Sequence, residues 1–328
     1  MKRAQGCMTW FVGVEAAADK KFRRWPKFLA VMLAQHVTWI KMSDTKLLPM
    51  TTGGGGNGEV EEDAPLWLLP TMWRKALAEW FGTAFLVIVG CGALSSNGGS
   101  GGTLIPMWAF GGVVQSLIQS LSGISGCHVN PQVTLAAVAV GTLSFTEGAA
   151  YVVAQMLGAV CGGGFLWLIL PDVPHGSPLS GRAGCTMLAP GMHPWQGMLT
   201  EAAGTALLVT VVLVADMHKP WAARNNSSLS GPLGVLTALI SIIAFCGPLT
   251  GAGLNYARVF GPALVFGGEC FKSNHWLWPV GETLGSLLAV LFALVIVPGL
   301  WRKVAATFKL ASPVPPSAGG RSHVNYGT

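Results

Sequence analysis

The chain has 328 residues, of which 51% are hydrophobic and only 10% are charged. A soluble domain carries about 25% charged residues, so this composition excludes an ordinary soluble protein and predicts an all-α membrane protein. The formal net charge of +6 could attract nucleic acid, but the basic residues lie beside apolar segments, and we expect no nucleic-acid partner.

Six apolar segments approach or reach the roughly 20 residues that a helix needs to cross a lipid bilayer. In chain order they are 76–95, 103–122, 147–170, 198–216, 231–250 and 277–300. Glycine recurs within these segments, as it does where membrane helices pack closely. The sequence therefore predicts six transmembrane helices.

The distribution of basic residues predicts which side of the membrane each end occupies. They precede the first segment, separate the fourth from the fifth and follow the sixth: Lys20, Lys21, Arg23, Arg24, Lys27, Arg74, Lys75, Lys219, Arg224, Arg302 and Lys303. By the positive-inside rule both termini are cytoplasmic, which fits an even number of spans. The sequence does not distinguish the plasma membrane from an intracellular membrane.

The two ends of the chain differ from its middle. Residues 1–72 are predicted to be a largely flexible cytoplasmic extension, in which 28–40 could form a short interfacial helix. Residues 303–328 are predicted to be a disordered cytoplasmic tail, which is rich in Pro, Gly and Ser from about residue 311. The membrane domain is therefore predicted to span 73–302.

The membrane domain contains an internal repeat. The segment that begins at Glu79 returns at Glu201, and Asn130 is matched 125 residues later by Asn255. The two halves, about 73–170 and 198–302, contain three spans each and must have opposite orientations. Inverted repeats of this kind place a substrate path near the middle of the membrane.

Each half also contains an apolar segment that is too short to span, about 131–140 and 256–266. Asn130 and Asn255 precede these segments, and asparagine is a strong helix N-cap. Pro131 then occupies the first helical position, where its missing N–H costs nothing. Two half-helices entering from opposite faces would point their positive dipole ends at one place, repel cations and leave the asparagine amides free to donate.

These motifs resemble the aquaporin (major intrinsic protein) family. The resemblance covers about 73–302 and rests on Ala-Glu-x-x-Gly-Thr, Ile-Ser-Gly-Cys-His-Val-Asn-Pro-Gln-Val-Thr-Leu, Tyr-x-x-Ala-Gln-x-x-Gly-Ala and Leu-Asn-Tyr-Ala-Arg-Val-Phe-Gly-Pro-Ala. It implies an aquaporin-like channel domain of six transmembrane helices and two re-entrant half-helices, assembled as a homotetramer. It also implies passive conduction of water and small neutral solutes such as ammonia, hydrogen peroxide or urea, with no enzymatic activity, cofactor or metal.

The signature Asn-Pro-Ala of the family is altered in both halves. The first copy has glutamine in the third position, and the second has tyrosine in the second position: Asn130, Pro131 and Gln132, then Asn255, Tyr256 and Ala257. Both asparagines remain, so the central donors are expected to remain. Tyr256 restores a backbone N–H and adds bulk where the two prolines of the family meet. The sequence therefore does not determine how wide the pore neck is.

Arg258 follows Asn255 by three residues and is expected on the same helix face. A charge at membrane depth costs about 3 kcal/mol, so it requires a reason, although an arginine can also extend to the membrane surface. The resemblance implies that Arg258 belongs to a selectivity filter with Phe110, Ile243 and Ala252. Strict water filters of the family carry histidine at the position of Ile243, so this filter is predicted to be apolar and moderately wide.

Other polar residues of the membrane domain have less certain roles. The resemblance implies that Glu79 and Glu201 accept backbone N–H bonds from the re-entrant loops, although membrane carboxylates are often functional. His128 either lines the inner vestibule near Cys127 or only braces its loop. Glu282, where the family usually has proline, has no obvious partner in the sequence.

Three questions remain open from the sequence alone. Cys185 and Cys270 are predicted on the outer side, where a disulfide is possible, but the scattered cysteines favour separate packing roles. A secondary transporter can also use inverted repeats and broken helices, although no acid–base pair suited to coupling is evident. A structural homologue that no longer conducts is a third reading, prompted by Gln132 and Tyr256.

Overall fold

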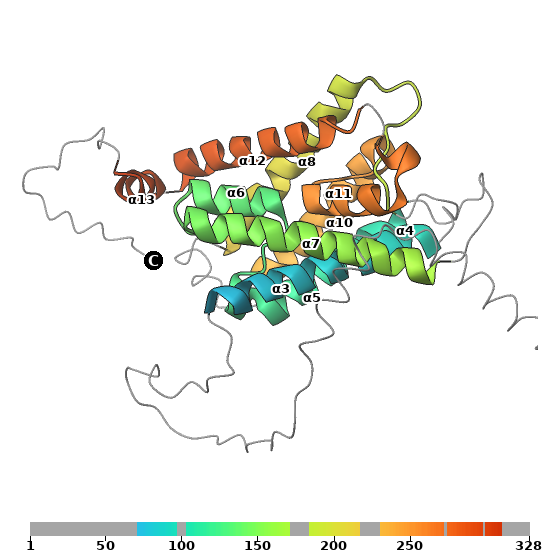
Figure 1. The fold of residues 1–328 in the computed structure, drawn as a ribbon. Helices are drawn as coiled ribbons and strands as arrows, with labels where there is room; N and C mark the ends of the chain where they lie inside the picture. The colour runs from blue at the N-terminus through green and yellow to red at the C-terminus, as the bar shows by residue number, and fades with distance from the viewer. Residues whose placement is uncertain are drawn as a thin grey trace, which may run out of the picture. The chain divides into compact units, whose positions relative to one another are not determined.

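The computed structural model describes residues 71–96, 103–170, 184–216, 230–271, 274–297 and 299–309. The predicted interfacial helix at 28–40 and most of both predicted flexible ends lie outside these residues. Within them every regular element is a helix (Figure 1).

Six helices are long and apolar enough to cross a membrane, which confirms the predicted fold. The first is continuous from α3 (Thr71–Leu86) through a π-helical turn, η1 (Val87–Cys91), into α4 (Gly92–Ser96). The others are α5 (Leu104–Ser125), α7 (Phe145–Ile169), α8 (Pro194–Val211) with its π-helical end η2 (Val212–Asp216), α10 (Ser230–Thr250) and α12 (Leu277–Ile296).

The predicted spans were wrong only near their ends. The first helix starts at Thr71 rather than 76 and α8 at Pro194 rather than 198, whereas α12 ends at Ile296 rather than 300. Hydropathy does not locate helix ends closely, because local capping interactions also contribute to them. For example, Ser144 caps α7 by accepting a hydrogen bond from the Glu147 N–H at 3.2 Å.

Close packing between helices depends on glycine at equivalent places of the two halves. A Cβ on Gly158 of α7 would overlap the carbonyl oxygen of Trp80 in α3, and one on Gly285 of α12 would overlap that of Ala202 in α8. Glycine therefore lets the backbones of each helix pair approach closely. The same arrangement recurs one turn away, where a Cβ on Gly162 would overlap the carbonyl oxygen of Ala84 and one on Gly281 that of Met198.

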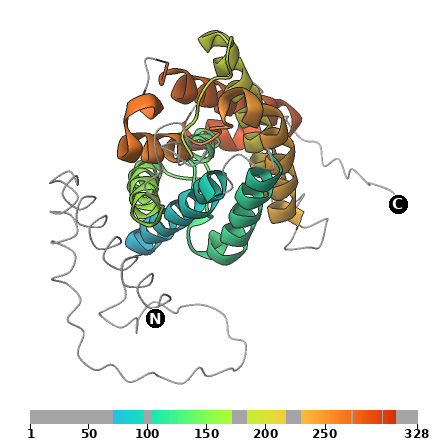
Figure 2. The ribbon, with the colours of Figure 1, turned by 90° about the vertical axis from the view of Figure 1, so that its right-hand side faces the viewer.

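Two shorter helices complete the bundle, α6 (Pro131–Ala139) and α11 (Tyr256–Phe266). With 9 and 11 residues they are only about 14 and 17 Å long, half of a bilayer core. Figure 1 shows them on the two sides of the bundle centre, and in Figure 2 the first-half helices, blue to green, lie largely opposite the second-half helices, yellow to red. A 3-10 turn, η3 (Gly268–Phe271), follows α11.

The outer faces of the spanning helices are apolar. On α12 alone, large side chains at successive turns are exposed, among them Leu284, Leu288, Leu291 and Val295. Such a surface would be unfavourable in water but suits contact with lipid. The polar side chains of the membrane domain, by contrast, are concentrated inside the bundle.

The predicted boundary of the C-terminal tail was wrong. Residues 303–307 are not an irregular tail but belong to α13 (Leu300–Thr307), in which Val304 and Ala305 are buried. This helix is strongly amphipathic because Trp301, Arg302 and Lys303 are on its exposed face. A short apolar stripe within a polar segment was not recognisable from hydropathy alone.

Candidate permeation pathway

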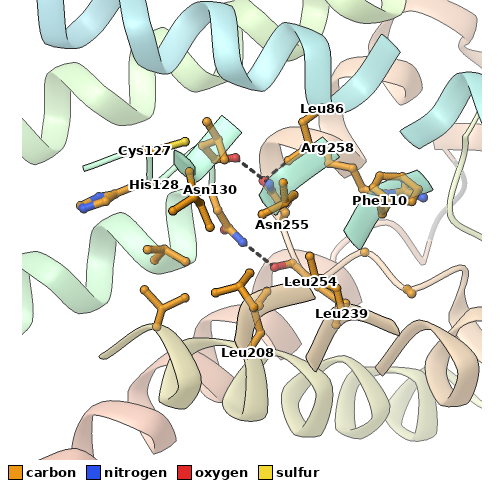
Figure 3. A pocket seen from close by; sticks show the side chains of 18 of the residues that line it. Leu86, Phe110, Cys127, His128, Asn130, Leu208, Leu239, Leu254, Asn255 and Arg258 are labelled. Atoms are coloured by element: carbon orange, nitrogen blue, oxygen red, sulfur yellow. Dashed lines mark hydrogen bonds between the residues drawn. The ribbon is translucent and has the colours of Figure 1, made fainter. Parts of the chain in front are cut away.

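A cavity runs through the centre of the bundle and is lined by ten residues from each half of the repeat. Its middle contains the two asparagines. In Figure 3, Cys127 and His128 lie toward one end, Phe110 and Arg258 toward the other, and Asn130 and Asn255 between them. We refer to these as the His128 end, the Arg258 end and the neck.

The neck is built from the N-caps of the two half-helices. The side-chain oxygen of Asn130 accepts the Gln132 N–H at 2.9 Å, and that of Asn255 accepts the Arg258 N–H at 3.3 Å. Each side-chain amide also donates across the repeat, from Asn130 to the Leu254 carbonyl at 2.9 Å and from Asn255 to the Val129 carbonyl at 2.7 Å (Figure 3). Because an amide nitrogen carries two hydrogens, each asparagine retains one further donor in the cavity.

The loops before the half-helices have the same unusual backbone in both halves. Cys127 and Val129 in the first loop, and Ala252 and Leu254 in the second, have φ between 43° and 55°. Non-glycine residues rarely adopt this left-handed region, and for branched Val129 it is costly. The conformation must therefore be stabilised by the surrounding contacts.

Glu79 stabilises the first loop. Its two oxygens accept hydrogen bonds from the Ser125 hydroxyl at 2.7 Å, the His128 N–H at 2.9 Å, the Val129 N–H at 2.7 Å and the Gln155 amide at 2.8 Å. The carboxylate is completely buried. Burial of a charged acceptor is tolerable only where donors surround it, as they do here.

Glu201 has the equivalent position behind the second loop. It accepts hydrogen bonds from the Gly253 and Leu254 N–H groups, both at 2.9 Å, and from the Thr250 hydroxyl. Neither Glu79 nor Glu201 lines the cavity. Both carboxylates therefore act on the pathway through the loops that they hold.

Arg258 is the charged residue of the cavity wall, and its side chain is 2% exposed. The guanidinium donates to the carbonyl oxygen of Gly184 and, at 3.3 Å, to that of Gly251. It also lies over the Phe110 ring, 5.1 Å from the centroid, in cation–π contact. No described residue accepts from its Nε, so the fixed side chain keeps unused donor capacity.

Phe110, Ile243 and Ala252 line the same cavity as Arg258, and the Phe110 ring lies against the guanidinium. Gly90 determines how Phe110 packs, because any side chain at Gly90 would overlap the phenyl ring. Apart from Arg258, the side chains of this group offer no polar atom. The four residues predicted to form the filter are therefore apolar apart from one cation.

A model of the major intrinsic protein family matches residues 67–293. The chain belongs to the major intrinsic protein, or aquaporin, family. It is 34% identical over 252 residues to a probable aquaporin PIP2-8 of Oryza sativa subsp. japonica, covering 74% of this chain and 88% of the rice protein. It is 33% identical over 252 residues to the lens fiber major intrinsic protein of Gallus gallus, covering 76% and 90%.

Among solved structures, the aquaglyceroporin from Plasmodium falciparum has the same fold, with a TM-score of 0.61 at 21% identity. The match covers 70% of this chain and 98% of that chain. Together with the six apolar spans, family membership makes this protein an integral, multi-pass membrane channel rather than an enzyme.

The two altered motif positions of this aquaporin-family chain meet each other. The Tyr256 N–H donates to the side-chain oxygen of Gln132 at 3.0 Å. The Tyr256 ring packs 5.9 Å from that of Phe260 and 6.0 Å from that of His275. Neither Gln132 nor Tyr256 lines the cavity, and neither do the other two motif residues, Pro131 and Ala257.

The His128 end is held partly by His128 itself. Its backbone N–H binds Glu79, its Nδ1 lies 3.2 Å from the Thr134 hydroxyl, and its ring packs edge-on against Tyr151 at 5.4 Å. His128 and Cys127 also line the cavity. The histidine thus both lines the pathway and braces its loop, so the two sequence readings are not alternatives.

Sequence reasoning missed several residues of the cavity wall. Ile118, Val133 and Val235 line it, and the Gly184 carbonyl holds Arg258 from a loop without any motif. The repeat offered a signal for the first three, because each lies 125 residues from a predicted filter residue: Ile243, Arg258 and Phe110, respectively. Nothing in the sequence marked Gly184.

Cys185 and Cys270 form a disulfide, with a Cα–Cα distance of 5.4 Å. The preference for separate packing roles was therefore wrong for this pair. The bond joins the segment that follows Gly184 to η3, so it fastens the loop whose carbonyl holds Arg258. The two cysteines are 85 positions apart, and the sequence alone could only leave their pairing open.

Proposed function

We propose that this protein conducts water by passive diffusion through the cavity, together with small neutral solutes such as ammonia, hydrogen peroxide or urea. The arrangement of the two asparagines is the main support. Each N-caps a half-helix, donates one amide hydrogen to the opposite loop and keeps one for a molecule in the neck. Converging positive helix ends at the same place disfavour cations.

The composition of the Arg258 end supports neutral solutes in addition to water. The ring formed by Phe110, Ile243, Ala252 and Arg258 offers donors only from the guanidinium. An apolar wall with one cationic side accepts small molecules that carry an acceptor and need few other hydrogen bonds. The fixed charge in a low-dielectric pore opposes permeation of cations and protons.

The altered motifs do not argue for a protein that has lost conduction. Gln132 and Tyr256 prompted that reading, but both side chains lie outside the cavity wall. The neck residues themselves, Asn130 and Asn255, are those of the family motif. A secondary transporter would instead require saturable uptake driven by an ion gradient.

We also propose a homotetramer with one pathway per subunit and both termini in the cytoplasm. The basic residues beside the spans support this orientation. The disulfide beside the Arg258 end supports it independently, because disulfides persist on the oxidising side of a membrane. Chemical cross-linking in native membranes measures the subunit number, and protease accessibility of tagged termini measures the orientation.

Osmotic swelling of proteoliposomes tests the proposed function. The full-length protein is reconstituted, and light scattering records volume changes after an osmotic step with an impermeant solute and then with urea. We expect water flux well above that of protein-free vesicles, without saturation and without dependence on an ion gradient. Rates equal to those of protein-free vesicles would refute the proposal.

A further inference from the structure

The two departures from the family motif are joined by a hydrogen bond. Gln132 belongs to the first turn of α6 and Tyr256 is the first residue of α11, 124 positions later. The Tyr256 N–H donates to the Gln132 Oε1 at 3.0 Å. One unusual residue in each half-helix therefore contacts the unusual residue of the other.

Tyr256 adds a hydrogen-bond donor and Gln132 adds a hydrogen-bond acceptor, and each satisfies the other. Proline at position 256 would have no N–H, whereas tyrosine has one that lies in the first helical turn and lacks an acceptor within its helix. Alanine at position 132 would offer no side-chain acceptor. Gln132 is only 4% exposed, so its amide must also find partners inside the protein.

Gln132 is fixed by further hydrogen bonds, which link it to the N-cap of α6 and to α12. Its backbone N–H donates to the Asn130 Oδ1 at 2.9 Å, and its carbonyl accepts from the Ser286 hydroxyl of α12 at 2.8 Å. Ser286 is completely buried. The side-chain contact with Tyr256 thus connects the start of α11 to the N-cap of α6 and to α12.

We propose that Gln132 and Tyr256 are an interdependent pair of positioning residues that sets the two half-helices, and hence Asn130 and Asn255, at the correct separation. In this chain a hydrogen bond replaces the contact between two prolines that the family motif implies. The two changes are compatible only together. Changing Gln132 to alanine and Tyr256 to proline at once restores the family sequence in both motifs.

A double-mutant cycle on the full-length protein tests this coupling. The native chain, Gln132→Ala, Tyr256→Pro and the double variant are compared by thermal unfolding in detergent and by water flux in proteoliposomes. We expect each single change to lower the unfolding temperature, because a buried hydrogen-bonding group loses its partner, and to lower water flux severalfold, because the two asparagines lose their correct separation. The double variant should recover most of both losses.

The double-mutant cycle also distinguishes the coupling between Gln132 and Tyr256 from the general effect of proline on stability. Proline restricts the unfolded chain and can stabilise a protein at a compatible site, but this effect is present with or without Gln132 and cancels in the cycle. Single losses that add in the double variant would overturn the proposal. If a single variant does not fold, recovery of folded protein in the double variant would still support the coupling, and its failure to fold would contradict it.

Two matched variants test which atoms of Tyr256 and Gln132 make the contact. Tyr256→Phe keeps the backbone N–H and the ring, so it should behave like the native chain, whereas Gln132→Met keeps the volume but loses the acceptor and should behave like Gln132→Ala. A Tyr256→Phe variant as impaired as Tyr256→Pro would contradict the assignment to the backbone N–H. The unfolding measurements remain decisive for the pair even if the native protein conducts no water.

Discussion

The two ends of the cavity are built by equivalent positions of the inverted repeat, yet they differ in chemistry. Four pairs of residues 125 positions apart line the cavity: Phe110 and Val235, Ile118 and Ile243, Cys127 and Ala252, and Val133 and Arg258. The loops that carry them share the same left-handed residues. From the symmetry of the repeat we infer one ring of four residues at each end, apolar where it contains Val133 and charged where it contains Arg258.

Replacing Arg258 by valine should remove most of this difference, because valine is the residue at the equivalent position of the other ring. We expect Arg258→Val to raise proton and cation leak by about tenfold or more while water flux persists, since the fixed charge is lost. A pH-sensitive dye inside proteoliposomes records the leak. Val133→Leu is the matched control and should leave it unchanged; equal leak in both variants would contradict the role of Arg258.

The neck, in contrast to the rings, is chemically the same from both halves. Asn130→Leu and Asn255→Leu should therefore reduce water flux strongly and to a similar extent, because each removes a donor, a cross-loop bond and an N-cap worth about 1 kcal/mol. Swelling assays at equal protein content measure this effect. Normal water flux in either folded variant would contradict a pathway through the neck.

The carboxylates behind the loops show a further difference between the halves. Gln155 donates to Glu79 in the first half, and the equivalent residue 127 positions later is Glu282. Glu282 is fully buried, and within the described parts of the chain no hydrogen bond of ordinary geometry reaches its oxygens, although the Asn255 N–H is near. The second half thus contains a carboxyl where the first contains an amide donor.

Exchanging these two residues tests whether the amide donor matters. Gln155→Glu removes the donor to Glu79 and buries a second carboxyl, so it should destabilise the protein by about 2 kcal/mol. Glu282→Gln supplies an amide without changing size and should stabilise the protein, by about 1 kcal/mol. Thermal unfolding in detergent measures both. A stabilising Gln155→Glu or a strongly destabilising Glu282→Gln would contradict the stabilising role of the amide donor.

The same comparison explains what could be predicted from the sequence. The spans, the repeat and the asparagine-capped half-helices depend on local patterns, namely hydropathy, an offset of 125 residues and capping chemistry, so they could be recognised. The Gly184 contact with Arg258 and the Cys185–Cys270 disulfide each join the segment between the two halves to a distant residue of the second half, so no repeat or local pattern indicated them. The bond between Gln132 and Tyr256 was equally hidden, because each residue alone looked like a defect in a motif.

The last prediction concerns Ile243, which differs from its equivalent Ile118 only in its surroundings. Ile243→His places a donor and a larger polar ring opposite Arg258, so it should lower urea flux by a few-fold while largely sparing water. Ile118→His makes the same change at the other ring, where Val133 replaces the arginine, and should affect urea less. Stopped-flow swelling with urea and with an impermeant osmolyte separates the two fluxes. Equal effects of the two variants on urea would mean that the Arg258 end does not determine solute selectivity, even though both isoleucines line the same cavity.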